Sequence, residues 1–230
     1  MRVKDPWSSL RKDMCFCSVE PNIEITSITT PIEPAMYSSE SLPALAAATS
    51  YGTTIDDIIK ARSLNKKLIE MGHHTPLEAI QYNFYISNIS KACGTQLSRH
   101  RIGQGHISSS RRYKKQGEAF IYPVLNHLED ETDVKHIYTN MSTHCKLSLA
   151  YYDLIINSGG KKQDARLVMP YNTACERRMW INARALRDMF RLRLDASAEW
   201  EIRRLCFLML DIVYAIHPSL FQDIHDKYND

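Results

Sequence analysis

The amino-acid sequence predicts an α+β fold, a helix-rich single domain with a small antiparallel sheet. Three observations support this prediction. The chain of 230 residues has the length of one domain. Most patterned segments repeat apolar residues every three or four positions, as amphipathic helices do, and a few alternate apolar with polar residues, as strands do. No internal repeat or low-complexity linker divides the chain, so one domain should hold these elements.

The first predicted elements are a strand and a helix. Residues 23–30, IEITSITT, alternate enough to form a strand. Residues 53–72 begin with a threonine that suits an N-cap and end at a glycine. Within them one apolar stripe recurs at helical spacing, formed by Ile55, Ile58, Ala61, Leu64, Leu68 and Met71. This segment is predicted to be an amphipathic helix.

The middle of the chain mixes both patterns. Pro76 suits a first helical turn, and residues 80–87, IQYNFYIS, then alternate as a strand does. Residues 91–97 suit a short helix, and residues 118–125 are predicted to be another strand. Residues 133–160 are predicted to be a long amphipathic helix that a final Gly-Gly pair stops.

The segment from residue 174 to residue 216 is predicted to be helical nearly throughout, with a break near Asp195. On a straight helix Asn182 and Arg193, eleven residues apart, would lie within about 20° of one face, with Leu186 and Met189 between them. A polar pair around an apolar stripe suits a helix that lines a ligand pocket. The alternative is that both residues cap the edge of the stripe and the arginine extends toward solvent.

Composition excludes several classes of protein. The chain is 44% hydrophobic and 24% charged with a net charge of +3, which is typical of a folded globular protein and not of a disordered or histone-like one. The longest apolar stretch, residues 206–216, is too short to span a membrane and contains Asp211. The first residues lack the apolar run of a secretory signal. We expect a soluble, cytoplasmic protein with no membrane partner.

The six cysteines are scattered in a chain that is large enough to fold without disulfides, so we expect reduced thiols. Neither the Cys15-Phe-Cys17 pair nor His73 and His74 give a recognisable zinc-site spacing, and no metal is expected.

Residues 98–115, SRHRIGQGHISSSRRYKK, place six Lys/Arg and two His among glycines and serines. Three interpretations are open: a solvated basic loop, a nucleic-acid contact, or a pocket for several phosphates. Nucleic acid is disfavoured because Tyr113 is the only aromatic residue there and the net charge of the chain is low. Arginine forks and serine hydroxyls packed this tightly suit small phosphates better.

Two shorter segments give weaker signals. Thr75 before Pro76, with Glu78 in the same turn, resembles a helix cap with an acidic first turn. Arg166, shortly before Pro170, indicates little by itself.

Taken together and in order, these segments resemble the flavin-dependent thymidylate synthases. The resemblance covers about residues 40–220 and leaves residues 1–35 as an N-terminal extension of unknown role before a domain at 36–230. It runs through HTPLEA (74–79), QLSRHRI (96–102), SRRY (110–113), ARLVMP (165–170) and NARALRDMFRLRLDASAEWEI (182–202).

The resemblance implies an FAD-dependent methyltransferase that moves a one-carbon unit from methylenetetrahydrofolate to C5 of dUMP, giving dTMP. It also implies NADPH as the source of reducing equivalents and a homotetramer with active sites between subunits. Two phosphate-bearing ligands require several arginines, and a guanidinium near the pyrimidine stabilises the negative charge that makes C5 nucleophilic. The flavin performs the redox chemistry, while the protein orients and polarises the ligands.

Residue roles follow from the resemblance by position. Arg193 is the expected catalytic residue, because it would polarise the pyrimidine. Ser110 is interpreted as a phosphate donor and not a nucleophile, since no adjacent base is evident. The expected FAD contacts are Thr75, Glu78, Arg99, His100, Arg101, Ile102, Asn182, Arg184 and Asp188. The expected pyrimidine-nucleotide contacts are Gln96, Arg99, Ser108, Ser109, Ser110, Arg111, Arg112, Arg166 and Arg193.

The chain departs from the family pattern in residues 102–113. Eight residues separate RHR from Ser110, where the family has seven, and using Ser109 instead puts Arg112 in place of the tyrosine. Either way the segment lacks the Asn-Glu pair that the family places near the nucleotide. Glu199 also stands where the family usually has Gln. Candidate substitutes for the missing carboxylate are Ser108, His106 and Gln104.

These departures leave two alternatives to dUMP methylation. The first is a related enzyme that modifies another pyrimidine nucleotide, such as dCMP, or releases a 5-hydroxymethyl product. The second is a non-catalytic relative that binds nucleotide or nucleic acid.

Overall fold

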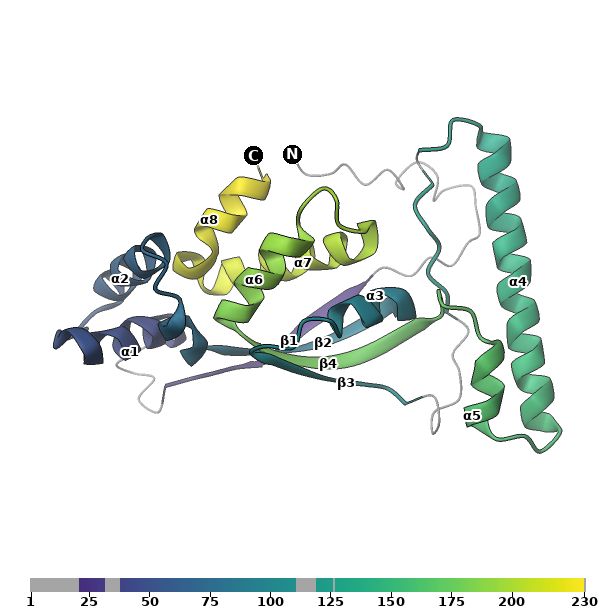
Figure 1. The fold of residues 1–230 in the computed structure, drawn as a ribbon, viewed down its shortest axis with the longest axis horizontal. Coiled ribbons are helices and arrows are strands. Elements are labelled where there is room, and N and C mark those ends of the chain that lie inside the picture. Colours follow the sequence, from purple (N-terminus) through teal and green to yellow (C-terminus); the bar gives the residue numbers. More distant parts are fainter. Residues whose placement is uncertain (1–20, 32–37, 111–118, 126, 230) are drawn as a thin grey trace.

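The structure, a computed structural model, describes residues 21–31, 38–110, 119–125 and 127–229. It confirms the predicted α+β class: in these ranges eight α-helices accompany one four-stranded antiparallel sheet (Figure 1). None of the helices in the described part of the chain is long and apolar enough to cross a membrane. The four cysteines in these ranges, Cys93, Cys145, Cys175 and Cys206, are free thiols, as expected.

The sheet has the strand order β1-β2-β4-β3, and each strand is antiparallel to its neighbours. Burial alternates along β2, where Tyr82, Phe84 and Ile86 are buried and the residues between them are partly exposed. One face of the sheet therefore carries the core. The strands are β1 (Asn22–Ile28), β2 (Gln81–Ser90), β3 (Gln104–Ser108) and β4 (Ala174–Asn182).

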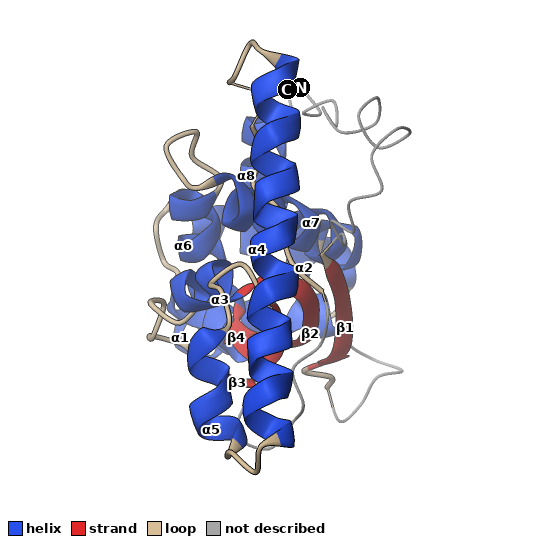
Figure 2. Cartoon of the chain, turned by 90° about the vertical axis from the view of Figure 1, so that its right-hand side faces the viewer, coloured by secondary structure: helices blue, strands red, loops and turns tan. Residues whose placement is uncertain are grey.

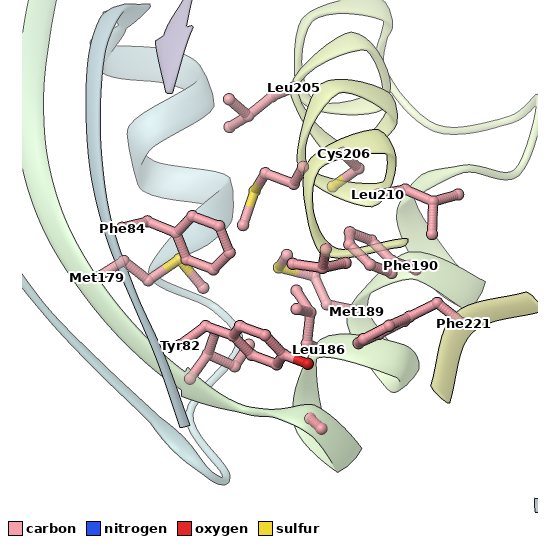
Figure 3. Packing of buried hydrophobic residues seen from close by; sticks show 14 of the residues in the cluster. Tyr82, Phe84, Met179, Leu186, Met189, Phe190, Leu205, Cys206, Leu210 and Phe221 are labelled. Atoms are coloured by element: carbon pink, nitrogen blue, oxygen red, sulfur yellow. The ribbon is translucent and has the colours of Figure 1, made fainter. Parts of the chain in front are cut away.

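Helices cover that apolar face (Figure 1). In the main core, Tyr82 and Phe84 of β2 and Met179 of β4 face Leu186 and Phe190 across the interior, with helix residues further along the chain closing the other side (Figure 3). The helices of this layer are α3 (Lys91–Leu97), α6 (Ala183–Arg193), α7 (Trp200–Ile216) and α8 (Pro218–Asn229). Helices α1 (Leu42–Tyr51) and α2 (Ile58–Glu70) lie together beyond one end of the sheet and have a small apolar cluster of their own (Figure 1). Short 3-10 turns are η2 (Ser39–Ser41), η3 (Thr75–Ala79) and η4 (Arg166–Val168).

A buried ion pair joins α6 to α8. The Arg187 side chain is 1% exposed, and its two terminal nitrogens donate to the carboxylate of Asp223 at 2.7 and 2.6 Å. The same guanidinium also donates to the Leu220 carbonyl. The pair fixes how the site-bearing helix α6 sits in the helical layer.

The long helix α4 (Glu131–Asn157) stands at one end of the molecule, with the short α5 (Lys162–Ala165) beside it (Figures 1 and 2). It has a small core of its own, formed by Phe120, Tyr122, Val134, Tyr138 and Cys145. Part of the surface of α4 is apolar and exposed: Leu147, Tyr151 and Leu154 are 52, 51 and 59% exposed.

Several predicted elements are confirmed. The strands expected at 23–30 and 80–87 are β1 and β2, and the short helix at 91–97 is α3. The long helix expected at 133–160 is α4, and the break near Asp195 separates α6 from α7. Although β1 precedes residue 36, it pairs with β2 along its length, so this part of the N-terminal segment is built into the sheet.

The helix predicted to start at residue 174 was wrong over its first nine residues, which form β4. Burial alternates there, with Arg177, Met179 and Ile181 buried and Arg178 exposed between them. The arginines obscured this alternation in the sequence, and pairing with β2 and β3 on both sides favours the strand. Asn182 is therefore not on a helix face with Arg193.

Two other predictions need correction. The helix expected from residue 53 begins at Ile58, because Asp57 caps it by accepting from the Lys60 amide at 2.7 Å. At its end Met71 is exposed and not part of the buried stripe. Residues 118–125 are not a strand in the part described, where Phe120 makes one isolated bridge to Thr173.

Part of the basic segment 98–115 is not a loop but the edge strand β3. Its pairing with β4 depends on a glycine, since a Cβ atom at Gly105 would lie 2.4 Å from the Trp180 ring. Residues 111–118 lie outside the described ranges.

Candidate active site

Three of the expected ligand contacts converge where α3, α6 and the start of α7 meet. Arg193 is the last residue of α6, and its guanidinium bonds to two side chains from the α3 region. Its Nε donates to His100 Nε2 at 3.0 Å, and its Nη1 donates to Gln96 Oε1 at 3.3 Å. We call Arg193, Gln96, His100 and Glu199 the Arg193 cluster. The sequence brought the first three to one site only through the resemblance.

His100 must be neutral to make this contact. Arginine has no acceptor, so His100 Nε2 carries the lone pair and its proton is on Nδ1. Burial, reinforced by the positive charge of Arg193, lowers the pKa of His100 from its usual value of 6.5. At neutral pH His100 is therefore uncharged and can accept the hydrogen bond from Arg193.

Glu199 joins the cluster from the other side. It is the N-cap of α7, accepting from the Ile202 amide at 3.4 Å, and it accepts from Gln96 Nε2 at 3.2 Å. Sequence reasoning did not include Glu199 among the site residues. The signal that identifies it is the departure from the glutamine that the family usually has there.

Buried contacts next to the cluster hold α3 and α7 together. Glu201 is 3% exposed and accepts from the Ser90 amide at 2.6 Å and the Ser90 hydroxyl at 2.5 Å. The Ser90 hydroxyl in turn caps α3 by accepting from the Cys93 amide. Burial raises the pKa of Glu201 against the opposing effect of these hydrogen bonds. Gln96 and Glu199 therefore sit on elements whose relative position is fixed.

A second group of expected residues lies at the other end of α6, about 15 Å away for a helix of this length. Asn182 caps α6 by accepting from the Ala185 amide at 2.8 Å. Its own backbone amide donates to the Gly103 carbonyl at 2.9 Å. Gly103 has φ +69°, and a Cβ atom there would lie 2.6 Å from the Asn182 side chain, so this close approach requires glycine. Residues 99–103 thus run from one end of α6 to the other.

Arg184 and Glu78, both expected at the flavin, form an ion pair of 2.7 Å between α6 and η3. Thr75 begins η3 and is exposed, and it does not act as the helix cap that the sequence suggested, since no side-chain cap bond occurs there. Asp188 is exposed on α6 and pairs with Arg191 at 3.5 Å. These residues lie together on one side of the α6 N-terminal half.

Arg99, Arg101 and Ile102 lie in the segment that runs between the two ends of α6, and their side chains are exposed. Ile102 is 91% exposed although it is apolar, and Arg101 directly precedes it in the chain. An apolar side chain near exposed guanidiniums suits a ligand with both a ring and phosphates. The residues present therefore fit FAD.

The serine run lies at the edge of the sheet. Ser108 ends β3 opposite Arg177, and the Ser109 amide donates to the Glu176 carbonyl at 3.1 Å. Arg177 is 8% exposed and donates to the Ser98 hydroxyl at 2.9 Å. Sequence reasoning missed Arg177 because its segment was predicted to be helical.

Some expected residues are not brought to the cluster. Arg166 follows α5 at the α4 end of the molecule, and its Nε donates to the Gln163 carbonyl at 3.1 Å within its own segment (Figure 1). Arg111 and Arg112 lie outside the described residues. In the described ranges no group of three or more His, Cys, Asp or Glu side chains gathers as a metal site would require.

We expect kcat/KM to fall as the pH drops below about 6.5, the usual pKa of histidine. Protonated His100 could no longer accept from Arg193 and would repel its positive charge. Because the pKa of His100 is lowered, kcat/KM should fall at a pH below 6.5. The pH profile of kcat/KM measures this. In His100→Gln the amide oxygen still accepts from Arg193 but does not titrate, so the acid limb should flatten; an unchanged acid limb would assign it to another group.

The Arg193 guanidinium at one end of α6 and the exposed Arg99 and Arg101 suit anionic ligands that carry a ring. Comparison with known proteins identifies the family of the chain. Residues 34–219 match the family described as Thymidylate synthase complementing protein. A flavin-dependent thymidylate synthase of Geobacter sulfurreducens is 30% identical over 191 residues, covering 80% of this chain and 81% of that protein.

Two further relatives carry the same name. One from Mycobacterium bovis is 30% identical over 204 residues, covering 82% of this chain and 75% of its own length. One from Saccharolobus solfataricus is 32% identical over 151 residues, covering 66% of this chain and 56% of its own length. The chain belongs to the thymidylate synthase complementing family, the flavin-dependent thymidylate synthases. The predicted enzyme class, a flavin-dependent methyltransferase of dTMP synthesis, is confirmed at the level of the family.

Proposed function

We propose that this chain methylates dUMP at C5 to give dTMP, with FAD as cofactor and methylenetetrahydrofolate and NADPH as co-substrates. The Arg193 cluster carries the proposal. A guanidinium held at Nε by His100 and at Nη1 by Gln96 keeps its other N–H groups without a partner among the described residues. Such a fixed cation stabilises negative charge that accumulates on a pyrimidine ring during attack from C5.

FAD would be held by Arg99, Arg101 and Ile102 on one side and by the residues around the α6 N-terminus on the other. The helix N-terminus and the two guanidiniums suit its phosphates, and Ile102 offers an apolar contact to a ring. Bound there, the flavin supplies the electrons that reduce the transferred one-carbon unit to a methyl group. The protein contributes binding and orientation.

The phosphate of the nucleotide would be held by serines 108–110 with Gln96 and arginines of the basic segment. Ser108 and Ser109 lie at the edge of the sheet, on the strand that follows the RHR segment. Small hydroxyl donors at a strand end reach a phosphate without a long, mobile side chain. This assignment is the phosphate-pocket interpretation of residues 98–115.

We also propose a homotetramer in which Arg166 serves the site of a neighbouring subunit. Arg166 begins η4, which lies beside α4 and α5, whereas the Arg193 cluster lies on α3, α6 and α7. The exposed apolar residues of α4 at i, i+4 and i+7 favour association. Light scattering of the purified protein tests the oligomeric state. The cytoplasmic location expected from the sequence stays a prediction.

Residues 102–110 contain no carboxylate, and this favours a second candidate, a pyrimidine other than uracil. A family member that lacks the acidic residue beside the ring has lost one means of distinguishing the hydrogen-bonding edges of uracil and cytosine. The candidate is modification of dCMP, or release of a 5-hydroxymethyl product.

The experiment offers dUMP and dCMP separately to the purified protein with FAD, NADPH and methylenetetrahydrofolate, and identifies the products by mass spectrometry. We expect a methyl group on dUMP and yellow, flavin-bearing protein. A modified dCMP or a hydroxymethyl product would replace the leading proposal with the second candidate. Absence of any product from protein with bound flavin would contradict both.

A further inference from the structure

We propose that Glu199 is a positioning residue that sets the orientation of the Arg193 guanidinium by fixing the side-chain amide of Gln96. The inference rests on the proposed role of Arg193 in polarising the pyrimidine. It concerns a residue that lies within the matched segment 182–202 but to which the resemblance assigns no role.

The first step is the direction of the Gln96 amide. A glutamine side chain has a donor end and an acceptor end of nearly equal size, and its hydrogen bonds decide which way round it lies. The carboxylate of Glu199 is an acceptor only, so it selects the Nε2 end of Gln96, at 3.2 Å. The Oε1 end must then face the opposite way.

The second step is what that oxygen meets. Gln96 Oε1 accepts from Nη1 of Arg193 at 3.3 Å, and His100 Nε2 accepts from Nε of the same guanidinium at 3.0 Å. Two acceptors on adjacent nitrogens determine both the position and the plane of the guanidinium. We call these two hydrogen bonds the frame of the guanidinium. The second N–H of Nη1 and both N–H groups of Nη2 have no partner among the described residues, so these N–H groups can donate to a ligand.

The third step is that Glu199 itself is held in place. The turn between α6 and α7 is closed by Asp195, whose carboxylate accepts from the amide and hydroxyl of Ser197 at 2.9 and 2.6 Å. Arg203 donates to the Ala196 carbonyl of the same turn at 3.1 Å. Together with the buried Glu201–Ser90 contact, this fixes Glu199 opposite Gln96.

A glutamine in place of Glu199 would not enforce the same order. The side-chain amide introduced by Glu199→Gln could offer either its oxygen or its nitrogen to Gln96. In the second case the Gln96 amide would turn its own NH₂ toward Nη1 of Arg193. Two donors would then face each other and the guanidinium would lose one side of its frame. The negative charge of Glu199 makes the hydrogen-bond chain run in one direction only.

The test compares Glu199→Gln with the parent protein. We expect kcat to fall about tenfold, equivalent to about 1.4 kcal/mol, while KM for dUMP changes by less than about twofold and flavin content and Tm stay the same. Asp57→Asn is the matched control, because Asp57 is also an acidic N-cap that accepts from the third following amide, at 2.7 Å, but on α2. An equal loss of kcat in both variants would mean that general capping explains the effect and would overturn the proposal.

A second background separates action through Gln96 from direct action. In Gln96→Met the amide is absent, so adding Glu199→Gln should change kcat no further. Additive losses would show that Glu199 does not act through Gln96. A crystal structure of Glu199→Gln gives a readout that needs no activity: we expect the Gln96 amide reversed and the Arg193 guanidinium displaced. An unchanged frame would refute the inference even if the wild-type protein made dTMP, whereas failure of the wild type to make product bears on the proposed function alone.

Discussion

Arg193→Ala should lower kcat by about 10²–10³-fold, the loss typical of removing one donor that stabilises charge in a transition state. The reason is that the guanidinium is the fixed cation of the site, framed by His100 and Gln96. Flavin content should be unchanged, because Arg193 is not itself among the expected flavin contacts and most of these lie on η3 and toward the opposite end of α6. Single-turnover kinetics with dUMP and the flavin absorbance of the purified variant measure the two effects.

The matched control for this variant is Arg178→Ala. Arg178 is an exposed arginine on the face of β4 away from the helices, where its guanidinium lies 5.1 Å from the centre of the Tyr85 ring. Its loss removes the same charge from the chain but none from the Arg193 cluster, so turnover should stay near that of the parent. Turnover of Arg193→Ala within about tenfold of the parent would contradict the catalytic role. If Arg193→Ala loses flavin together with activity, Arg193 would instead be assigned to flavin binding.

The sequence was sufficient where the pattern of one segment decides its structure. The apolar residues that recur every three or four positions in 53–72 predict α2. The alternation of apolar and polar residues in 80–87 predicts β2. Both patterns arise because one face of each element is buried and the other is not. The sequence was insufficient at 174–182, where two arginines stand in an alternating strand. Arg177 is buried there by contacts that the local sequence does not record: α3 at Gly94 and Ser98.

The candidate site was predicted from motifs more than from physical pattern. Nothing in the spacing of Gln96, His100 and Arg193 indicates that they meet, since they come from two regions almost one hundred residues apart. Their contact depends on how α3 and α6 sit on the sheet, which Glu201 and Arg187 help to fix from buried positions. The role of Glu199 was out of reach for the same reason, because its partner is 103 residues away.

The two ends of α6 carry different groups of the candidate site. Its C-terminal end presents the guanidinium of Arg193 beside α3 and α7, and its N-terminal end presents Asn182 and Arg184 beside Gly103 and Glu78. Residues 99–103 run between the two ends, so one short segment contacts both. In the proposed function a single helix would thereby hold two ligands in a constant relative position, which a group transfer between them requires.

That rigidity depends on how α6 is anchored, and Asp223→Ala should therefore lower the free energy of unfolding by about 3 kcal/mol, the lower part of the range for breaking a buried ion pair. The substitution leaves the guanidinium of Arg187, 1% exposed, without its carboxylate and with the Leu220 carbonyl as its remaining contact. The Asp223 side chain is 47% exposed, so the effect should be below that of a fully buried pair. Urea unfolding monitored by circular dichroism measures it.

The double variant Arg187→Met/Asp223→Ala separates the buried charge from lost packing. Met fills much of the same space with no charge to leave unpaired, so the double variant should be more stable than Asp223→Ala alone. If the two variants are equally unstable, the cost lies in packing and not in the uncompensated guanidinium. If Asp223→Ala costs less than about 1 kcal/mol, water reaches Arg187 and the pair does not anchor α6. In the expected case, α8 stabilises the helix that carries Arg193, although none of its residues is expected to touch a ligand.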